Sequence, residues 1–238
     1  MKKKLFAIAV FTVVVMAACT NSGKKPTSTA NTEDNKMASV PAVKAADFKP
    51  FDVMEINHTV KDYASWKKGF DMDSVARKAN GLGFIAMGKS LDNPNNISIA
   101  FSTADVQKAK AFAADPRLKD VMEKNGVTSK PDITYWHVIK ANLDSKEKNW
   151  VLITHKVKDF DAWMKVYDGE GTATRATYGL VDVVLARGID DPNLVHIVFD
   201  INDMAKAKNR INDPALKKLM MDGGVEGEPK IEFYTMAE

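Results

Sequence analysis

Cysteine is nearly absent from this chain of 238 residues. The single cysteine is Cys19, so no disulfide can form within the chain. A core of buried apolar side chains must therefore hold the folded part together. A lone cysteine in an exported protein also calls for an explanation of its own, because an unpaired thiol there is unusual.

Long hydrophobic runs are missing as well. The apolar run Leu5–Ala18 spans 14 residues, whereas a membrane-spanning helix needs about 20. Lys2, Lys3 and Lys4 precede this run, which is the pattern of an export signal. We therefore expect residues 1–18 to be a signal peptide.

The end of this signal resembles the lipobox of bacterial lipoproteins. It reads Met16-Ala17-Ala18-Cys19, with small residues before the cysteine and Met16 where Leu is usual. The resemblance implies that Cys19 is acylated and anchors the mature chain to a lipid bilayer. The expected location is the bacterial cell envelope, at the outer membrane if the cell is Gram-negative. The alternative is an ordinary signal cut after Ala17 or Ala18, which leaves a free thiol.

An excess of positive charge is missing from the mature chain. The full sequence has 34 basic and 31 acidic residues, and three of the lysines lie in residues 1–18. Without them the numbers are equal. A nucleic-acid-binding protein usually shows a basic patch or stripe, so we expect no nucleic-acid partner.

Sequence motifs of common enzymes are also missing. We find no Gly-rich phosphate loop, no Ser-His-Asp order and no cluster of residues at metal-ligand spacing. The pair Gly223-Gly224 follows a short helical pattern and indicates its end. We therefore expect no metal and no cofactor. Whether the protein is an enzyme stays open at this point, and the sequence favours a non-catalytic role.

Residues 19–50 are rich in Ser, Thr, Asn, Lys, Ala and Pro. A segment of this composition buries too little apolar surface to offset the entropy of ordering. We interpret it as a flexible tether between the lipid anchor and the folded part. About 30 residues of coil span roughly 30 Å.

The rest of the chain is a repeat of two units, which we place at residues 51–140 and 149–238. The motif His-x-Val-Lys-Asp-x-x-x-Trp begins at His58 and again at His155, 97 residues later. Two further motifs recur 98 residues apart, so the second unit gained one residue between Asp168 and Arg175. The two are Asp-x-x-Lys-Ala-Lys, from Asp105 and Asp203, and Asp-Pro-x-Leu-Lys-x-x-Met-x-x-x-Gly-Val, from Asp115 and Asp213.

Each unit shows the same order of expected elements. Apolar and polar residues alternate at residues 97–101, which indicates a half-buried strand. Helices are expected after the capping residues Asp62, Asp105 and Asp115, and the first of these helices is expected to end at Gly81. The other expected strands are 53–58, 82–89 and 133–138. The order is β-α-β-β-α-(α)-β, a ferredoxin-like arrangement.

A sheet of this kind carries helices on one face only, so its other face must be covered. That face is partly apolar, and the linker between the units, residues 140–149, is short and polar. We therefore expect an α+β protein with two ferredoxin-like repeats packed sheet to sheet as an intramolecular α/β barrel. Such a protein can be monomeric.

The unit resembles the dimeric α/β-barrel superfamily, which includes antibiotic-biosynthesis monooxygenase-like domains. The resemblance rests on the His-x-Val-Lys-Asp-[Tyr/Phe]-x-x-Trp opening, the [Asn/Asp]-Pro-Asn turn and the Lys-Ala-Lys…Asp-Pro-x-Leu-Lys segment, and it covers residues 51–238. It implies the fold, but the superfamily hosts many activities. The Asn, Trp and His set of its haem-degrading members is not found at matching places. Two functions follow as hypotheses: an envelope lipoprotein that binds a small molecule or a partner, or a cofactor-independent monooxygenase-like or isomerase-like enzyme.

The duplicated residues are expected to be structural. His58 and His155 recur at the end of the first strand of each unit, and we expect a ring nitrogen of each to bond a nearby backbone group. The functional alternative is a symmetric pair of acid/base or ligand residues. Trp66 and Trp163 lie on apolar helical stripes and are expected in the core.

The candidate ligand site consists of residues that the duplication did not preserve. Strand alternation places them on the sheet face opposite the helices, so that they would line the barrel interior. A histidine, two carboxylates and two aromatic rings there could bind a small aromatic or apolar ligand. The alternative is that these side chains only fill the barrel interior and bond to one another. A register error of one residue would instead place all of them on the other face. The six residues are Glu55, Asn57, Trp136, His196, Glu232 and Tyr234.

Overall fold

The computed structural model describes residues 48–142, 144 and 147–237. The expected signal peptide, Cys19 and nearly all of the expected tether lie outside these residues. The first repeat comprises β1 (Phe51–Thr59), α1 (Tyr63–Met72), α2 (Ser74–Ala79), β2 (Leu82–Ser90), β3 (Asn96–Thr103), α3 (Val106–Ala113), α4 (Pro116–Lys124) and β4 (Asp132–Ala141). The second comprises β5 (Asn149–Val157), α5 (Phe160–Glu170), α6 (Thr172–Thr177), β6 (Leu180–Gly188), β7 (Leu194–Ile201), α7 (Met204–Ile211), α8 (Pro214–Asp222) and β8 (Val225–Met236).

Aspartates begin the helices at the expected places. The side chain of Asp62 accepts a hydrogen bond from the backbone N–H of Ser65, and Asp159 accepts the equivalent bond from Ala162. These bonds satisfy backbone donors that have no partner within the helix. Asp115 and Asp213 cap α4 and α8 in the same way, each just before a proline.

The helical region between the first two strands of each repeat differs from the expectation. It consists of two helices rather than one, α1 and α2 in the first repeat and α5 and α6 in the second. The break falls at Asp73 in the first repeat and at Gly171 in the second, where φ is +77°. A glycine adopts this backbone conformation without a steric penalty. Gly171 lies in the interval that holds the inserted residue.

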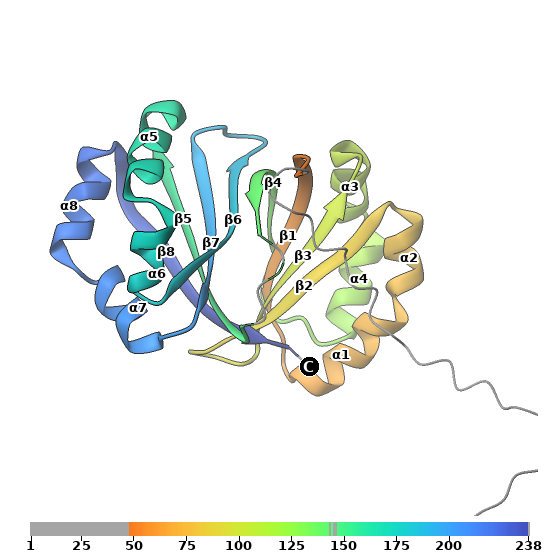
Figure 1. Ribbon diagram of the computed structural model, residues 1–238. Helices are drawn as coiled ribbons and strands as arrows, with labels where there is room; N and C mark the ends of the chain where they lie inside the picture. Colours follow the sequence, from red (N-terminus) through yellow and green to blue (C-terminus); the bar gives the residue numbers. More distant parts are fainter. Residues whose placement is uncertain (1–47, 143, 145–146, 238) are drawn as a thin grey trace, which may run out of the picture. The chain divides into compact units, whose positions relative to one another are not determined.

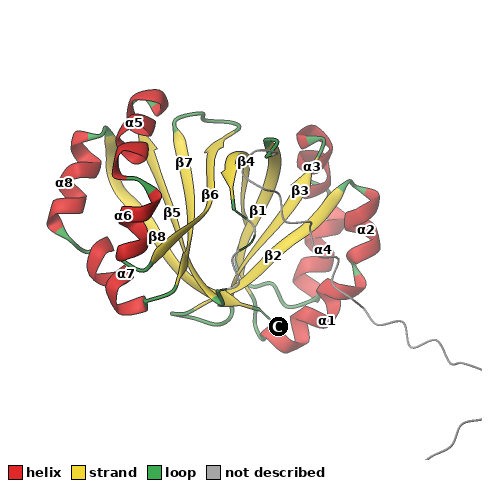
Figure 2. Ribbon diagram, viewed as in Figure 1, coloured by secondary structure: helices red, strands yellow, loops and turns green. Residues whose placement is uncertain are grey.

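The eight strands form one closed barrel in the order β1-β3-β2-β8-β5-β7-β6-β4. Within each repeat the strands pair antiparallel, and the helices cover the outer face of the sheet (Figures 1 and 2). The repeats are joined by hydrogen-bonded strand pairs, β4 with β6 and β2 with β8. The expected α+β architecture is confirmed. The inner sheet faces meet inside the barrel, and the sheet edges are joined as well.

One glycine allows the β2–β8 joint to close tightly. A Cβ atom at Gly88 would lie 2.4 Å from a ring atom of Trp150 and 3.1 Å from the Cβ of Tyr234. Contacts below 3 Å are repulsive, so another residue at this position would displace the indole ring.

Among the described residues, buried apolar side chains form three clusters. In each repeat one cluster lies between the sheet and the helices of that repeat. The cluster of the first repeat contains Trp66 and that of the second contains Trp163, as expected. The third lies inside the barrel around Val53, Trp136 and Val138. The outer and inner faces of every strand therefore contact different surroundings, and each face is a separate candidate for a site.

Candidate functional site

The barrel interior holds a buried carboxylate, that of Glu55 on β1. Trp136 on β4 donates its indole N–H to Glu55 Oε2 over 2.7 Å. Ser98 on β3 and Asn57 on β1 donate to Oε1 over 3.2 and 3.3 Å. All three donors are uncharged, and together they occupy both oxygens of a residue that is only 6% exposed. Such bonding allows a carboxylate to be buried.

His196 on β7 brings the second repeat into this cluster. Its ring stacks on Trp136, with 4.6 Å between ring centroids and 21° between the planes. Its Nε2 lies 3.8 Å from Glu55 Oε2, and its Nδ1 lies 3.1 Å from the hydroxyl of Thr154. Burial lowers the pKa of His196, while Glu55 and Glu232 oppose that effect. The ring is therefore neutral at neutral pH, and its contact with Glu55 is not an ion pair.

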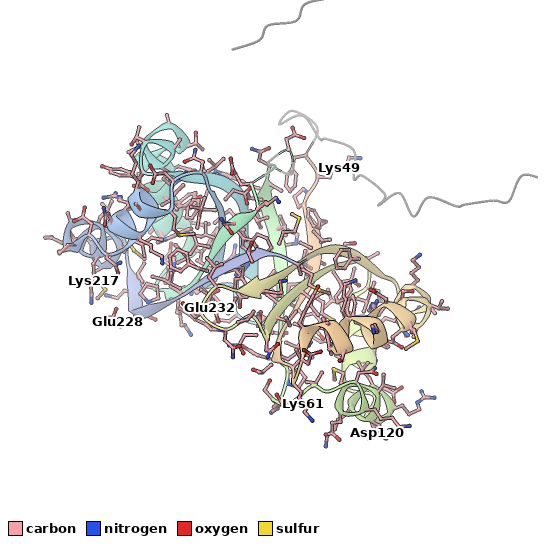
Figure 3. All side chains as sticks on the ribbon, turned by 90° about the horizontal axis from the view of Figure 1, so that it is seen from below. Lys49, Lys61, Asp120, Lys217, Glu228 and Glu232 are labelled. Atoms are coloured by element: carbon pink, nitrogen blue, oxygen red, sulfur yellow. The ribbon has the colours of Figure 1, made fainter. Side chains whose placement is uncertain are left out.

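Glu232 and Tyr234 on β8 complete the predicted set. Glu232 is labelled in Figure 3. Its side chain is one-third exposed and forms an ion pair with Lys230 over 2.9 Å. Tyr234 is buried and stacks on Trp150 at 6.3 Å. Burial, together with the neighbouring Glu232, raises the pKa of Tyr234. All six predicted residues thus lie on one face of the sheet. That they bind a ligand stays a prediction.

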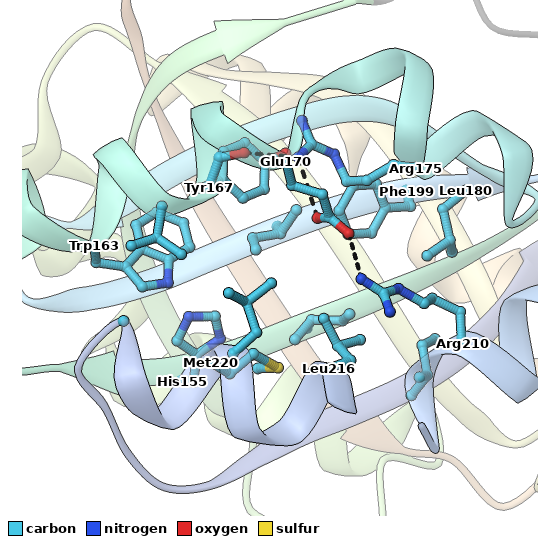
Figure 4. Close-up of a pocket in the computed structure, with 16 residues that line it drawn as sticks. His155, Trp163, Tyr167, Glu170, Arg175, Leu180, Phe199, Arg210, Leu216 and Met220 are labelled. Carbon is cyan, nitrogen blue, oxygen red and sulfur yellow. Dashed lines mark hydrogen bonds and ion pairs between the residues drawn. The ribbon is translucent and has the colours of Figure 1, made fainter. Parts of the chain in front are cut away.

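A pocket of about 80 Å³ lies on the other side of the sheet, between β5, β6, β7 and helices α5 to α8 (Figure 4). We call it the helix pocket. Much of its wall is apolar, with Ile153 and Ile197 from the sheet and Leu216 and Met220 from α8. A cavity of this size can hold several water molecules or one small organic molecule.

Charged side chains form one part of the wall of the helix pocket. Arg175 donates two hydrogen bonds to Asp182, over 2.8 and 2.9 Å, and lies 3.4 Å from Glu170. Arg210 donates to the other oxygen of Glu170 over 2.7 Å. Glu170 therefore bridges two arginines, as Figure 4 shows. The buried Nε of Arg210 has no hydrogen-bond partner among the described residues.

His155 forms another part of the wall. It is 4% exposed and meets Trp163 edge-on, with 5.4 Å between the ring centroids. Neither ring nitrogen has a hydrogen-bond partner within the described parts of the chain, and the same holds for His58. The expected bond to a backbone group is therefore wrong, because each ring points into the helix-side core and packs against a tryptophan. Burial lowers the pKa of both histidines to about 4.

The first repeat has a smaller counterpart of the helix pocket, about 60 Å³. By the repeat spacing, Phe112 takes the place of Arg210, and Asn125 takes the place of Gly223. The Asn125 side chain fills the space beside Gly69, where a Cβ atom would lie 2.3 Å from it. The arginine pair bridged by a carboxylate is thus particular to the second repeat.

The described part of the chain lacks a candidate metal site and a candidate membrane-spanning helix. No group of three or more His, Cys, Asp or Glu residues there could hold a metal ion. No helix there is long and apolar enough to cross a membrane.

No protein-family model and no curated protein sequence matches the chain. Solved structures do match. An anthrone oxidase-like protein superposes with a TM-score of 0.54 at 13% identity, over 82% of this chain and 94% of the other. A candidate chlorite dismutase gives 0.52 at 13% identity, over 79% and 95%. A candidate monooxygenase from Fusobacterium nucleatum gives 0.52 at 12% identity, over 79% and 93%.

The chain has the dimeric α/β-barrel fold. Both halves of the barrel come from one chain, each half ferredoxin-like, as the repeat predicted. At these identities the likeness concerns the fold alone, because one fold carries many activities.

Sequence reasoning missed the helix pocket of this dimeric α/β barrel. All six predicted residues lie on the inner face of the sheet, whereas the helix pocket lies on the outer face. A usable signal was present, since Arg210 aligns with Phe112 and is therefore also unduplicated. Which helix residues surround a gap depends on how the helices pack, and the repeat pattern does not contain that information.

Proposed function

We propose that this protein is a membrane-anchored module of the bacterial envelope that binds a small, mostly apolar molecule in its helix pocket. The observation that carries the proposal is a cavity of about 80 Å³ with an apolar wall and unpaired polar atoms at His155 and Arg210. An unpaired buried polar atom costs about 1–3 kcal/mol. A ligand that bonds to these atoms would remove part of that cost.

The chemistry of the wall favours an uncharged ligand. The helix pocket contains two arginines, but Glu170 and Asp182 bind them. The neutral ring of His155 can donate one hydrogen bond and accept another, and Arg210 Nε can donate one. A small aromatic or aliphatic molecule with one hydroxyl or carbonyl group fits this arrangement.

The same wall argues against catalysis. His155, with a pKa of about 4, is a poor general base near neutral pH, where the best bases have a pKa close to the working pH. Burial and Asp182 raise the pKa of Tyr167, so its hydroxyl keeps its proton. The wall supplies hydrogen bonds and apolar surface. The alternative, a cofactor-independent monooxygenase-like or isomerase-like enzyme, would gain support from turnover of a quinol that His155→Ala or His196→Ala abolishes.

The six interior residues are a second candidate ligand site. Trp136, His196 and Glu55 contact one another directly, so a ligand there would have to separate them. No such separation is needed in the helix pocket, and we therefore place the ligand there first. Because each repeat covers the inner sheet face of the other, we also propose that the protein is a monomer.

The ligand site is tested with a matched pair of variants. Leu216 lines the helix pocket, and Leu118 takes the equivalent place in the first repeat. The protein is titrated with phenol and NMR spectra are recorded. We expect phenol to shift the resonances of residues around His155. Leu216→Trp fills the pocket and should weaken this binding at least tenfold, whereas Leu118→Trp should leave it within twofold.

Three other results of this titration would contradict the pocket. They are equal weakening by both variants, shifts centred on Trp136 instead of His155, or no shifts at all. The second of these would favour the interior site.

The anchor is tested by the variant Cys19→Ser. If Cys19 is acylated, this variant should move from the membrane fraction to the soluble fraction, or accumulate with its signal still attached. Intact mass of the mature wild-type chain should show the added acyl groups. Unchanged fractionation together with an unmodified mass would reject the anchor and would leave the ligand proposal standing.

A further inference from the structure

The cluster around Glu55 is a contact between the two repeats. Glu55 and Trp136 belong to the first repeat, and His196 and Thr154 belong to the second. The repeat spacing places Leu152 opposite Ser98 at the symmetry-related positions. Leu152 carries no charge, so the equivalent carboxylate is missing there although the scaffold is duplicated.

Two groups from different rings converge on the same oxygen of Glu55. Trp136 Nε1 lies 2.7 Å from Oε2, and His196 Nε2 lies 3.8 Å from it. On its other side the imidazole meets the Thr154 hydroxyl at 3.1 Å. In a neutral imidazole one nitrogen carries a proton and the other does not. A second proton would make both nitrogens donors, one toward Glu55 and one toward Thr154.

We propose that His196 is a proton-operated contact between the two repeats. A hydronium ion of the solvent gives its proton to the ring nitrogen that carries none, so one O–H bond breaks and one N–H bond forms, and no covalent bond of the protein is broken. The Nε2–H of the charged ring then donates to Glu55 Oε2 and competes there with the indole N–H of Trp136. The carboxylate turns from a bond within the first repeat to a charged bond between the repeats.

Acidic groups surround the ring from two strands. Glu55 faces it from β1 and Glu232 from β8, and the only cation that bears on it among the described groups is Lys230. Glu232 is one-third exposed and Lys230 about half exposed, so the cluster reaches solvent on the β8 side. Both carboxylates favour the protonated ring, and burial opposes it. Uptake is therefore expected below pH 6.5.

The test follows the indole N–H resonance of Trp136 by NMR from pH 7.5 to pH 4.5, in the full chain. Trp136→Phe assigns the resonance. We expect an upfield movement with one inflection, because the hydrogen bond to Glu55 weakens as His196 takes up a proton. The ring resonances of His196 should titrate with the same midpoint, and this second measurement needs no substitution at the contact.

Variants decide whether His196 is the source. His196→Gln should remove the inflection, and Glu55→Gln should move the His196 midpoint to lower pH, because the carboxylate that favours the proton is gone. His155→Gln, on the other face of the sheet, should leave both curves unchanged. An indole resonance that is constant while the His196 ring titrates would overturn the proposal. So would a His196 ring that stays neutral down to pH 4.5, or an inflection that persists in His196→Gln.

Discussion

The two repeats have the same aspartate caps before α1 and α5 and the same buried tryptophans, and they differ at several positions that face a cavity. Asp62 and Asp159 make the same capping bond, and Trp66 and Trp163 are 3% and 4% exposed. The positions that shape helices and cores were therefore kept in both copies. Several positions around the pockets and inside the barrel differ between the copies, among them Arg210 against Phe112 and His196 against Ser98.

The arginines at equivalent positions of the two repeats, Arg77 and Arg175, illustrate this difference. Arg77 of the first repeat lies over the Phe70 ring, 3.8 Å from its centroid, and its ion pair with Asp73 is 3.6 Å long. Arg175 of the second repeat makes two short bonds to Asp182. Both guanidinium groups lie over an aromatic ring, since Arg175 is 4.0 Å from the centroid of Tyr167, and the short carboxylate bonds are particular to Arg175.

The largest expected effect comes from removing these two arginines. Arg175→Met removes both arginine hydrogen bonds to Asp182 and leaves Glu170 with Arg210 as its one arginine partner. Breaking a buried pair costs about 3–5 kcal/mol. Arg77→Met loses a cation–π contact and a long ion pair, which costs about 1 kcal/mol. Urea unfolding at pH 7.5 measures both. Equal losses would show that the two arginines contribute equally to the unfolding free energy, which would contradict this prediction.

Acid should destabilise both repeats alike. The pKa of His58 and of His155 is about 4 in the folded chain and about 6.5 in the unfolded chain. As the pH falls below 6.5, the two histidines bind protons in the unfolded state but not in the folded state. The unfolding free energy therefore has its full value above pH 6.5 and decreases as the pH falls toward 4. Each histidine should account for about 2 kcal/mol between pH 7.5 and pH 5.

The measurement is urea unfolding at these two pH values. His58→Gln and His155→Gln should each reduce the pH dependence by a similar amount, because the two rings have the same surroundings. If the unfolding free energy does not change with pH, the imidazole rings of His58 and His155 are hydrogen-bonded or solvated in the folded protein. A large difference between the two variants would show that the repeats differ here as well.

The smallest expected effect concerns the shared caps. Asp62→Ala and Asp159→Ala each remove one bond to a backbone N–H and should lower the unfolding free energy by about 1 kcal/mol. Asp62→Asn and Asp159→Asn keep an acceptor and serve as controls with little loss. If one cap costs several times more than the other, the scaffold is less symmetric than the sequence repeat indicates.

Much of the fold could be predicted because local patterns carry it. The recurrence of His58 at His155 established the duplication, aspartates before helices located their starts, and alternation along β3 and β7 separated the two sheet faces. The break between α1 and α2 was missed, since no proline or glycine marks it in the first repeat. The bond expected for the histidine rings was wrong, because it depended on which neighbours surround each ring in space.

The sequence by itself determined which residues share a face of the sheet, because side chains alternate along a strand with a period of two. It therefore grouped Glu55 with Asn57 and placed Trp136, His196 and Tyr234 on the inner face. The tertiary structure alone decided which of them touch and where space remains. Contact across the barrel depends on strand register between repeats, and the helix pocket exists because four helices do not fill the sheet face that they cover.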